Sequence, residues 1–157
     1  MKNPLKIETF NQIGFIVRDV EKAAKVWETL FGIGPFQILQ RAPEETIYKG
    51  KKEVFQIKNA LARIGPIQLE LVEVIQGNCC QKDFLEETGG GLHHLAVFVD
   101  DLDEALKTMK ELGIEVLQIG TAAGSIRFAY LDTKAQLGFV LEFMQLGKPK
   151  KKKDKQT

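Results

Sequence analysis

The stretch "HLAVFVDDLDEALKTMKELGI" (residues 94–114) decides the fold, because it repeats the earlier stretch "QIGFIVRDVEKAAKVWETLFGI" (residues 12–33). At an offset of 82 residues the apolar positions match, and Asp19 matches Asp101. In both copies the aspartate precedes apolar residues at i, i+3, i+4 and i+7, which predicts an aspartate-capped amphipathic helix. Gly32-Ile33 and Gly113-Ile114 follow the two helices, and glycine is typical of a helix C-terminus. The sequence therefore predicts one strand–helix unit twice.

Three strand-like segments follow each unit. They read "FQIL", "EVFQIKNALARIG" and "PIQLELVEV" in the first copy, and "EVLQIG", "IRFAYLDT" and "GFVLEFMQL" in the second. The closing strands match and pair Glu70 with Glu142, at an offset of 72. We therefore predict an α+β fold of two βαβββ modules, about residues 10–75 and 92–146, within one domain over residues 1–147. The linker "IQGNCCQKDFLEETGGG" is expected to hold a short helical turn around Phe84 and Leu85.

Composition narrows the class of protein. The chain has 157 residues, of which 44% are hydrophobic and 27% charged, as in soluble globular domains. A Lys-rich tail, residues 148–157, is expected to be disordered, and the mildly acidic body argues against nucleic-acid binding. No apolar stretch approaches the roughly 20 residues that span a bilayer. We therefore expect no membrane partner and a cytoplasmic protein. Adjacent Cys79 and Cys80 are expected in a loop, as incidental thiols.

Four polar residues stand at equivalent places on otherwise apolar strands: Gln12 with His94, and Glu70 with Glu142. A carboxylate within a buried strand is costly unless it is paired or binds a metal. One imidazole, one amide oxygen and two carboxylates suit Zn²⁺, Ni²⁺, Co²⁺, Mn²⁺ or Fe²⁺. Each residue alone is more often solvated or salt-bridged, but four related positions favour a metal site. The neighbouring His93 is expected to face the other way, because strand side chains alternate.

These modules, with candidate ligands on their first and last strands, resemble the vicinal oxygen chelate superfamily. It includes glyoxalase I, methylmalonyl-CoA epimerase, extradiol dioxygenases and bleomycin-resistance proteins. The resemblance covers about Phe10 to Met144 and implies curved, incomplete barrels with a divalent metal ion on Gln12, Glu70, His94 and Glu142. The motif "FLEETGGGLHHLAVFVDDLDEAL" is similar to methylmalonyl-CoA epimerases, which have His where this chain has Gln12. The ligand set Gln, Glu, His, Glu is similar to that of some glyoxalase I enzymes.

The resemblance implies a metal-dependent isomerase or lyase. Such an enzyme removes a proton alpha to a carbonyl and stabilises the resulting enolate or enediolate. Glu142 is the implied catalytic residue, as metal ligand, base, or both. The implied partners are a carbonyl substrate, such as an acyl-CoA or a thiol hemithioacetal, and a second copy in a homodimer. Candidates for a second acid, with none selected, are Glu44, Glu45 and Glu53.

Two other functions stay open. One is a non-catalytic small-molecule binding protein of the bleomycin-resistance type. The other is an Fe-dependent dioxygenase, which the single histidine in the ligand set weakens, because such sites use two histidines and one carboxylate. Among the aromatic residues, Trp27 is expected in the core, and Phe128 and Tyr130 either line the cavity or pack within the sheet.

Overall fold

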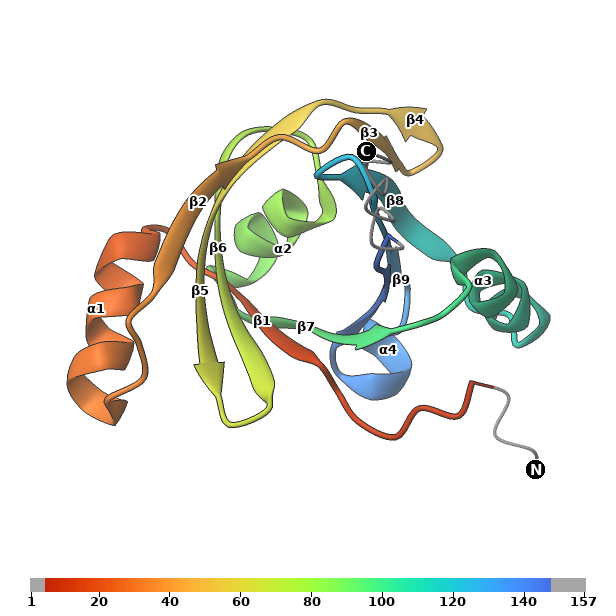
Figure 1. The fold of residues 1–157 in the computed structure, drawn as a ribbon. Coiled ribbons are helices and arrows are strands. Elements are labelled where there is room, and N and C mark those ends of the chain that lie inside the picture. The colour runs from red at the N-terminus through yellow and green to blue at the C-terminus, as the bar shows by residue number, and fades with distance from the viewer. Residues whose placement is uncertain (1–4, 148–157) are drawn as a thin grey trace, which may run out of the picture.

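One curved ten-stranded sheet forms the body of the protein in the computed structural model, which describes residues 5–147 (Figure 1). The predicted tail, residues 148–157, lies outside the described residues. The first module contains β1 (Gln12–Ile16), α1 (Val20–Phe31), β2 (Gln37–Arg41), β5 (Phe55–Ile64) and β6 (Ile67–Gly77). The second contains β7 (Gly91–Phe98), α3 (Leu102–Glu111), β8 (Val116–Ala122), β9 (Ile126–Leu131), α4 (Lys134–Leu137) and β10 (Val140–Gln145). The curled sheet confirms the predicted α+β fold.

The pairing of strands makes the two modules equivalent about the centre of the sheet. The strand order is β2-β5-β6-β1-β7-β10-β9-β8-β3-β4, so the first strands of the two modules are neighbours. β1 and β7 run antiparallel, with Gln12 opposite Ala96 and Gly14 opposite His94. Each also runs parallel to the last strand of its own module, where Gly14 lies opposite Glu70. Ala96 in turn lies opposite Glu142, so the pseudo-twofold relation read from the sequence holds in the register.

A hairpin that the sequence analysis missed joins the two modules. It consists of β3 (Glu45–Tyr48) and β4 (Lys51–Lys52), and β3 pairs with β8 of the second module. The chain therefore crosses from one end of the curved sheet to the other after β2 (Figure 1). The segment is short and rich in charged residues, and its partner strand lies about 70 residues away. A short, charged strand with a remote partner gives no periodic pattern in the local sequence.

The two long helices form as predicted. The Asp19 side chain accepts a hydrogen bond from the Lys22 amide at 2.9 Å, and the Asp101 side chain accepts one from the Glu104 amide at 3.1 Å. Both aspartates are therefore N-caps, and a glycine with positive φ follows each helix. Both helices lie on the convex side of the sheet, so its concave side is left for a cavity (Figure 1).

The linker forms a helix, α2 (Cys80–Thr88), which is longer than the predicted turn. Cys79 is its N-cap residue and Cys80 its first residue, so the predicted loop is wrong for Cys80, and both cysteines are buried free thiols. α2 lies inside the curve of the sheet (Figure 1). Trp27 of α1 packs against Phe15 with ring centroids 5.5 Å apart, as expected of a core residue.

None of the helices in residues 5–147 is long and apolar enough to cross a membrane. The cytoplasmic location stays a prediction.

Candidate functional site

The four residues singled out in the sequence meet around one imidazole nitrogen. Nε2 of His94 lies 3.2 Å from Oε1 of Gln12 and 3.3 Å from an oxygen of both Glu70 and Glu142. His94 is fully buried, and Gln12 and Glu142 are nearly so. The four side chains, hereafter the quartet, come from the first and last strands of both modules. The duplicated register therefore brings together residues that lie up to 130 positions apart in the chain.

Three further side chains orient the quartet. Nε2 of Gln12 donates to Oε1 of Gln68 at 2.7 Å, which turns Oε1 of Gln12 towards His94. Nδ2 of Asn59 donates to Oε1 of Glu70 at 2.5 Å. The hydroxyl of Tyr130 donates to the carboxylate of Glu142. Ligands held in this way by a second residue are typical of metal sites.

Burial dominates the electrostatics of Glu142. Desolvation raises the pKa of its carboxyl group to about 7, and the charge of Glu70 acts in the same direction. His94 and the hydrogen bond from Tyr130 partly oppose this rise. Burial would lower the pKa of His94, but Glu142 and Glu70 outweigh it and raise that pKa above its usual value. Without a metal ion, the two glutamates therefore favour the protonated form of His94.

Strand alternation predicted that His93 faces away from the site. This prediction is wrong. Nδ1 of His93 lies 3.0 Å from Nδ1 of His94, and the two rings are nearly perpendicular. The physical reason is a β-bulge: Gly14 lies opposite His94, but Phe15 lies opposite Leu92, so His93 is the extra residue. Burial and the charge of His94 hold the pKa of His93 well below its usual value. Neutral His93 can therefore accept a hydrogen bond from Nδ1 of His94, which directs Nε2 into the quartet.

The quartet fits a divalent transition metal in donor type and in the distances from Nε2 of His94 to the three oxygens. Ligand atoms bonded at about 2.0–2.2 Å lie roughly 3.0–3.5 Å from one another, depending on coordination geometry. The distances from Nε2 of His94 to the three oxygens fall within this range. Oε2 of Glu142 is also buried without a hydrogen bond. A buried carboxylate oxygen in this position is free to act as a ligand.

The other three side chains of the quartet lie around Nε2 of His94, but the ligand atoms do not form a compact cluster. In the described part of the chain, only Asp19, Glu21 and Glu73 have three such ligand atoms all within 4.8 Å of one another. That surface cluster has a structural explanation at the start of α1. Asp19 caps the helix, Glu73 accepts from the amide of Val20 at 3.0 Å, and Glu21 pairs with Lys58 at 3.0 Å.

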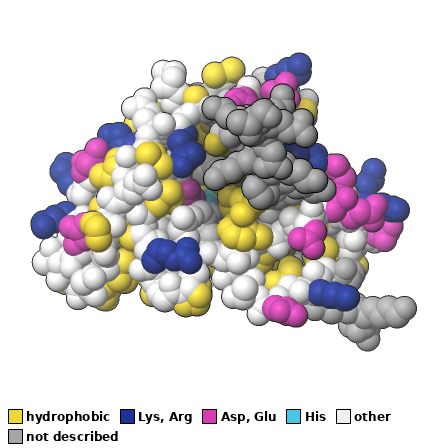
Figure 2. Space-filling view, viewed as in Figure 1, with side chains coloured by type: hydrophobic (Ala, Val, Ile, Leu, Met, Phe, Trp, Pro, Cys, Tyr) yellow, Lys and Arg dark blue, Asp and Glu magenta, His cyan; other side chains and the backbone are white. Residues whose placement is uncertain are grey.

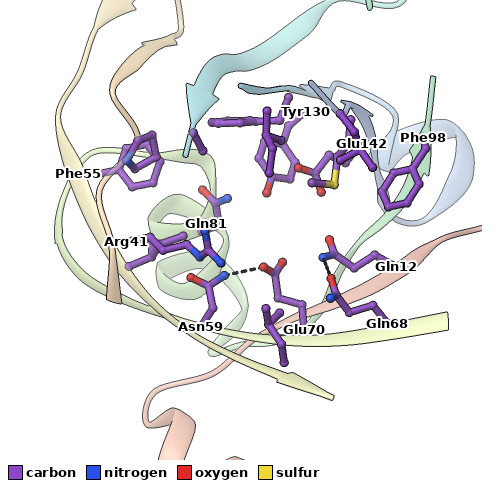
Figure 3. Close-up of a pocket in the computed structure, with 18 residues that line it drawn as sticks. Gln12, Arg41, Phe55, Asn59, Gln68, Glu70, Gln81, Phe98, Tyr130 and Glu142 are labelled. Atoms are coloured by element: carbon purple, nitrogen blue, oxygen red, sulfur yellow. Dashed lines mark hydrogen bonds between the residues drawn. The ribbon is translucent and has the colours of Figure 1, made fainter. Parts of the chain in front are cut away.

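A cavity of about 280 Å³ opens onto the quartet from the concave side of the sheet (Figure 3). Its wall is mostly apolar, with Phe128 and Tyr130 among its residues, so the cavity alternative for these two aromatic residues is correct. The space-filling view, from the same side as Figure 1, shows hydrophobic side chains near the middle of the molecule with charged ones among and around them (Figure 2). Such a cavity suits a small organic molecule.

The three candidates for a second acid do not lie in the wall of the quartet's cavity. Glu44, Glu45 and Glu53 line a separate cavity of about 480 Å³ beside β3, and none of them lines the cavity of the quartet. The prediction that one of them is a second acid at this site is therefore wrong, because the segment around β3 pairs with β8. The acidic residues that line the quartet's cavity are Glu70 and Glu142.

Four polar residues of the cavity wall were not identified from the sequence: Arg41, Asn59, Gln68 and Gln81. Gln68 had a signal, since it stands two residues before Glu70 on the same strand and so shares its face. Asn59 is a polar residue within the apolar part of β5. Arg41 and Gln81 carried no such signal, because the curvature of the sheet and the packing of α2 bring them to the wall.

A curved sheet of two βαβββ modules, with polar residues of the first and last strands meeting on its concave side, defines the class of protein. The chain belongs to the Glyoxalase/Bleomycin resistance protein/Dioxygenase superfamily, whose family model matches residues 11–130. This confirms the resemblance to the vicinal oxygen chelate superfamily.

Individual relatives are distant. The chain is 23% identical over 137 residues to the uncharacterized protein YqjC of Bacillus subtilis, covering 86% of this chain and 90% of that protein. Methylmalonyl-CoA epimerase from Mycobacterium tuberculosis superposes with a TM-score of 0.67 at 18% identity, covering 94% and 93% of the two chains. A hypothetical protein of Bacillus halodurans gives a TM-score of 0.66 at 19% identity, covering 91% and 97%. At these identities the solved structures show a shared fold.

Proposed function

We propose that the protein is a metal-dependent enzyme that moves a proton alpha to the carbonyl of a small substrate, as an isomerase or lyase. The observation that carries this proposal is the convergence of the quartet at the wall of a mostly apolar cavity. The cavity binds the substrate, and the quartet supplies the chemistry at one end of it.

The ligands of the metal ion would be Oε1 of Gln12, Nε2 of His94 and the carboxylates of Glu70 and Glu142. A divalent ion supplies Lewis-acid stabilisation for the negative oxygens of an enolate or enediolate. Gln68, Asn59 and Tyr130 keep the donor atoms directed inwards. His93 positions the His94 ring through the contact between their Nδ1 atoms.

Glu142 is the proposed catalytic residue. A positioned carboxylate can accept and return a proton, and Glu142 is a buried carboxylate in the wall of the cavity. A reaction that returns the proton to the same face of the substrate needs Glu142 alone. Epimerisation needs a second base on the other face, and Glu70 is the other carboxylate of this cavity wall. Glu142 and Glu70 are therefore the proposed proton-transfer residues for epimerase-like chemistry, and Glu142 alone is the proposed residue for glyoxalase I-like chemistry.

Two observations support different substrates. A variant of Streptomyces coelicolor methylmalonyl-CoA epimerase, in complex with 2-nitronate-propionyl-CoA, shares the fold with a TM-score of 0.63 at 18% identity, over 90% of this chain and 98% of that one. This favours an acyl thioester. Gln12, in the place of the epimerases' histidine, favours a thiol hemithioacetal, as in some glyoxalase I enzymes.

The test begins with the metal content of the purified protein. Deuterium incorporation into methylmalonyl-CoA from D₂O is then measured beside turnover of methylglyoxal with a thiol, with Zn²⁺, Ni²⁺ or Co²⁺ added. Glu142→Gln should lower turnover by about 10²-fold or more. Glu45→Gln is the matched control, because Glu45 is an exposed carboxylate outside the cavity. A protein that binds metal but fails both assays is not the proposed enzyme.

The same assays address the other candidates. A binding protein would show ligand binding but no loss of function in Glu142→Gln, and a dioxygenase would consume oxygen with Fe²⁺. We also propose a homodimer, supported by exposed apolar side chains of α1: Val26, Leu30 and Phe31 are 53%, 68% and 63% exposed. Light scattering of the purified protein measures its mass.

A further inference from the structure

Arg41 is a cation in the wall of the quartet's cavity. It is the last residue of β2 and lies opposite Ile57 of β5, so both side chains point to the concave side. Figure 3 shows its guanidinium directed towards Asn59 and Gln81, across the cavity from Glu142. No lysine and no other arginine lines this cavity within residues 5–147.

No carboxylate pairs with Arg41 in the described part of the chain, although the side chain is only partly exposed. Other cations are paired: Arg127 makes two hydrogen bonds to Asp103, at 3.0 and 2.8 Å, and Lys58 contacts Glu21 at 3.0 Å. A partly buried guanidinium has five donors in a planar fork, which suits a carboxylate or phosphate. An anionic ligand would therefore suit the unpaired guanidinium of Arg41.

The charges of the cavity wall lead to the same conclusion. Glu70 and Glu142 lie at one end, and the charge of a divalent ion on the quartet would offset both of them. Arg41 then remains as one uncompensated positive charge at the other end. A buried or partly buried charge is favourable only when it is paired. A ligand with one negative group would complete the balance.

One neighbouring polar atom is also available to a ligand. Oδ1 of Asn59 is buried without a hydrogen-bond partner. Gln81 lines the cavity too, but its Oε1 already accepts from Sγ of Cys80 and Nε2 of Gln118. Along β5, between the positions opposite Arg41 and Glu70, Ile57 and Leu61 face the cavity on either side of Asn59. This part of the wall therefore combines apolar side chains with one amide.

We propose that Arg41 binds an anionic group of the substrate at the end remote from the quartet. The proposal rests on the proposed function for the other end, where the substrate's oxygens meet the metal site. On β5, Ile57 lies opposite Arg41 and Leu61 lies opposite Glu70. These two positions of β5 are four residues, or about 13 Å, apart. The side chains of Arg41 and Glu70 both reach into the cavity. The substrate class is thus a small carbonyl compound whose chelating oxygens and anionic group are separated by a short chain.

The test uses dicarboxylates as probes. Binding of malonate, succinate, glutarate and adipate to the Co²⁺-loaded full-length protein is measured by calorimetry, beside butyrate and valerate as monocarboxylates. A second arm uses 3-phosphonopropionate, which distinguishes a phosphate-like from a carboxylate end group. The wild-type protein should bind at least one dianion about 10-fold more tightly than the monocarboxylates, as expected of one charge-assisted pair.

Arg41→Met should abolish this preference while monocarboxylates bind unchanged. Arg41→Lys should restore it in part, because lysine keeps the charge but loses the fork. Arg63→Met is the matched control, since Arg63 is an exposed arginine outside the cavity. Equal binding of dianions and monocarboxylates by the wild-type protein, or an unchanged preference in Arg41→Met, would overturn the proposal.

The two proposals fail in different ways. Cobalt affinity is measured separately and should be the same in wild type and Arg41→Met, which also shows that the variant is folded. If the wild-type protein binds no Co²⁺, the proposed function fails. A preference for dianions that depends on Arg41 and persists in EDTA would still support the anion site. If Co²⁺ binds normally and the preference is absent, the Arg41 proposal fails alone.

Discussion

The imidazole of His94 lies directly against Gly14, its cross-strand neighbour: a β-carbon at residue 14 would come within 1.9 Å of Cε1 of that ring. The equivalent residue of the second module is Ala96, whose cross-strand neighbour is Gln12. The duplication is therefore asymmetric at this point. Glycine is needed in the first module because the imidazole that packs against it comes from the second.

Gly14→Ala should displace the His94 ring and lower the affinity for Co²⁺ or Zn²⁺ by at least about 10-fold, with overpacking costing about 1–3 kcal/mol of stability. Metal titration and urea unfolding measure the two effects. Ala96→Gly is the control, because it alters the equivalent position without crowding His94. Unchanged metal affinity in Gly14→Ala would show that His94 is not a ligand.

The raised pKa of Glu142 predicts how the stability of the metal-free protein depends on pH. Its folded pKa, about 7, lies above its usual value of 4.5, so the folded state holds a proton that the unfolded state has released. Glu142 should therefore contribute a fall in the free energy of unfolding as pH rises from 4.5 to 7, by up to about 3 kcal/mol. Glu142→Gln should lose most of this fall. Urea unfolding in EDTA at pH 5 and pH 8 measures it, and parallel profiles would contradict the prediction.

His93 should determine metal affinity without touching the metal. His93→Phe keeps a ring beside Phe84, whose centroid lies 4.9 Å from that of His93, but removes the acceptor for Nδ1 of His94. Loss of such an orienting partner typically lowers metal affinity by about 10–100-fold. His93→Asn, which offers an acceptor oxygen, should recover part of it. The Co²⁺ absorption spectrum should change in His93→Phe; identical spectra and affinities would exclude a positioning role.

Tyr48 should anchor the hairpin that crosses between the modules. Its hydroxyl donates to the carboxylate of Asp83 on α2, and Lys49 contacts the same oxygen at 2.7 Å. Tyr48→Phe should destabilise the protein by about 1.5–3 kcal/mol, because a hydrogen bond to a charged acceptor is lost. Lys49→Met should cost less, since an exposed ion pair contributes at most about 1 kcal/mol. Urea unfolding compares them, and an equal or reversed order would contradict this role.

Acid should weaken the same anchor. Lys49, and then Tyr48, hold the pKa of Asp83 below its usual value of 3.8. The stabilisation by this carboxylate is therefore complete above pH 3.8 and is lost as pH falls through the lowered pKa. Asp83→Asn should reduce this acid-dependent loss of stability, which unfolding between pH 5 and pH 2 measures. An unchanged acid profile would show that the pair contributes nothing.

Much of the fold was predictable from local patterns. Apolar spacing and the caps Asp19 and Asp101 located both long helices, because helix periodicity and capping depend on neighbouring residues. The matching of Glu70 with Glu142 located the last strands. The β3–β4 hairpin was not predictable, since its partner β8 is remote in sequence and its own strands are short.

The quartet was predictable for a different reason. Gln12, Glu70, His94 and Glu142 stand at equivalent positions of a duplicated unit, so symmetry related them before any contact was known. His93 was misplaced because strand alternation holds only where the ladder is regular, and a bulge interrupts it at that residue. The three glutamates of the β3 region were misplaced because that segment pairs with the other module.

The sequence by itself determined the duplicated α+β architecture and the membership of the quartet, because both follow from short-range periodicity and from the repeat. Only the tertiary structure decided how the quartet is oriented and what faces it. The bulge turned His93 towards His94, and the curvature of the sheet brought Arg41 to the cavity wall. These features depend on how distant strands pair and curve, which no local pattern of residues encodes.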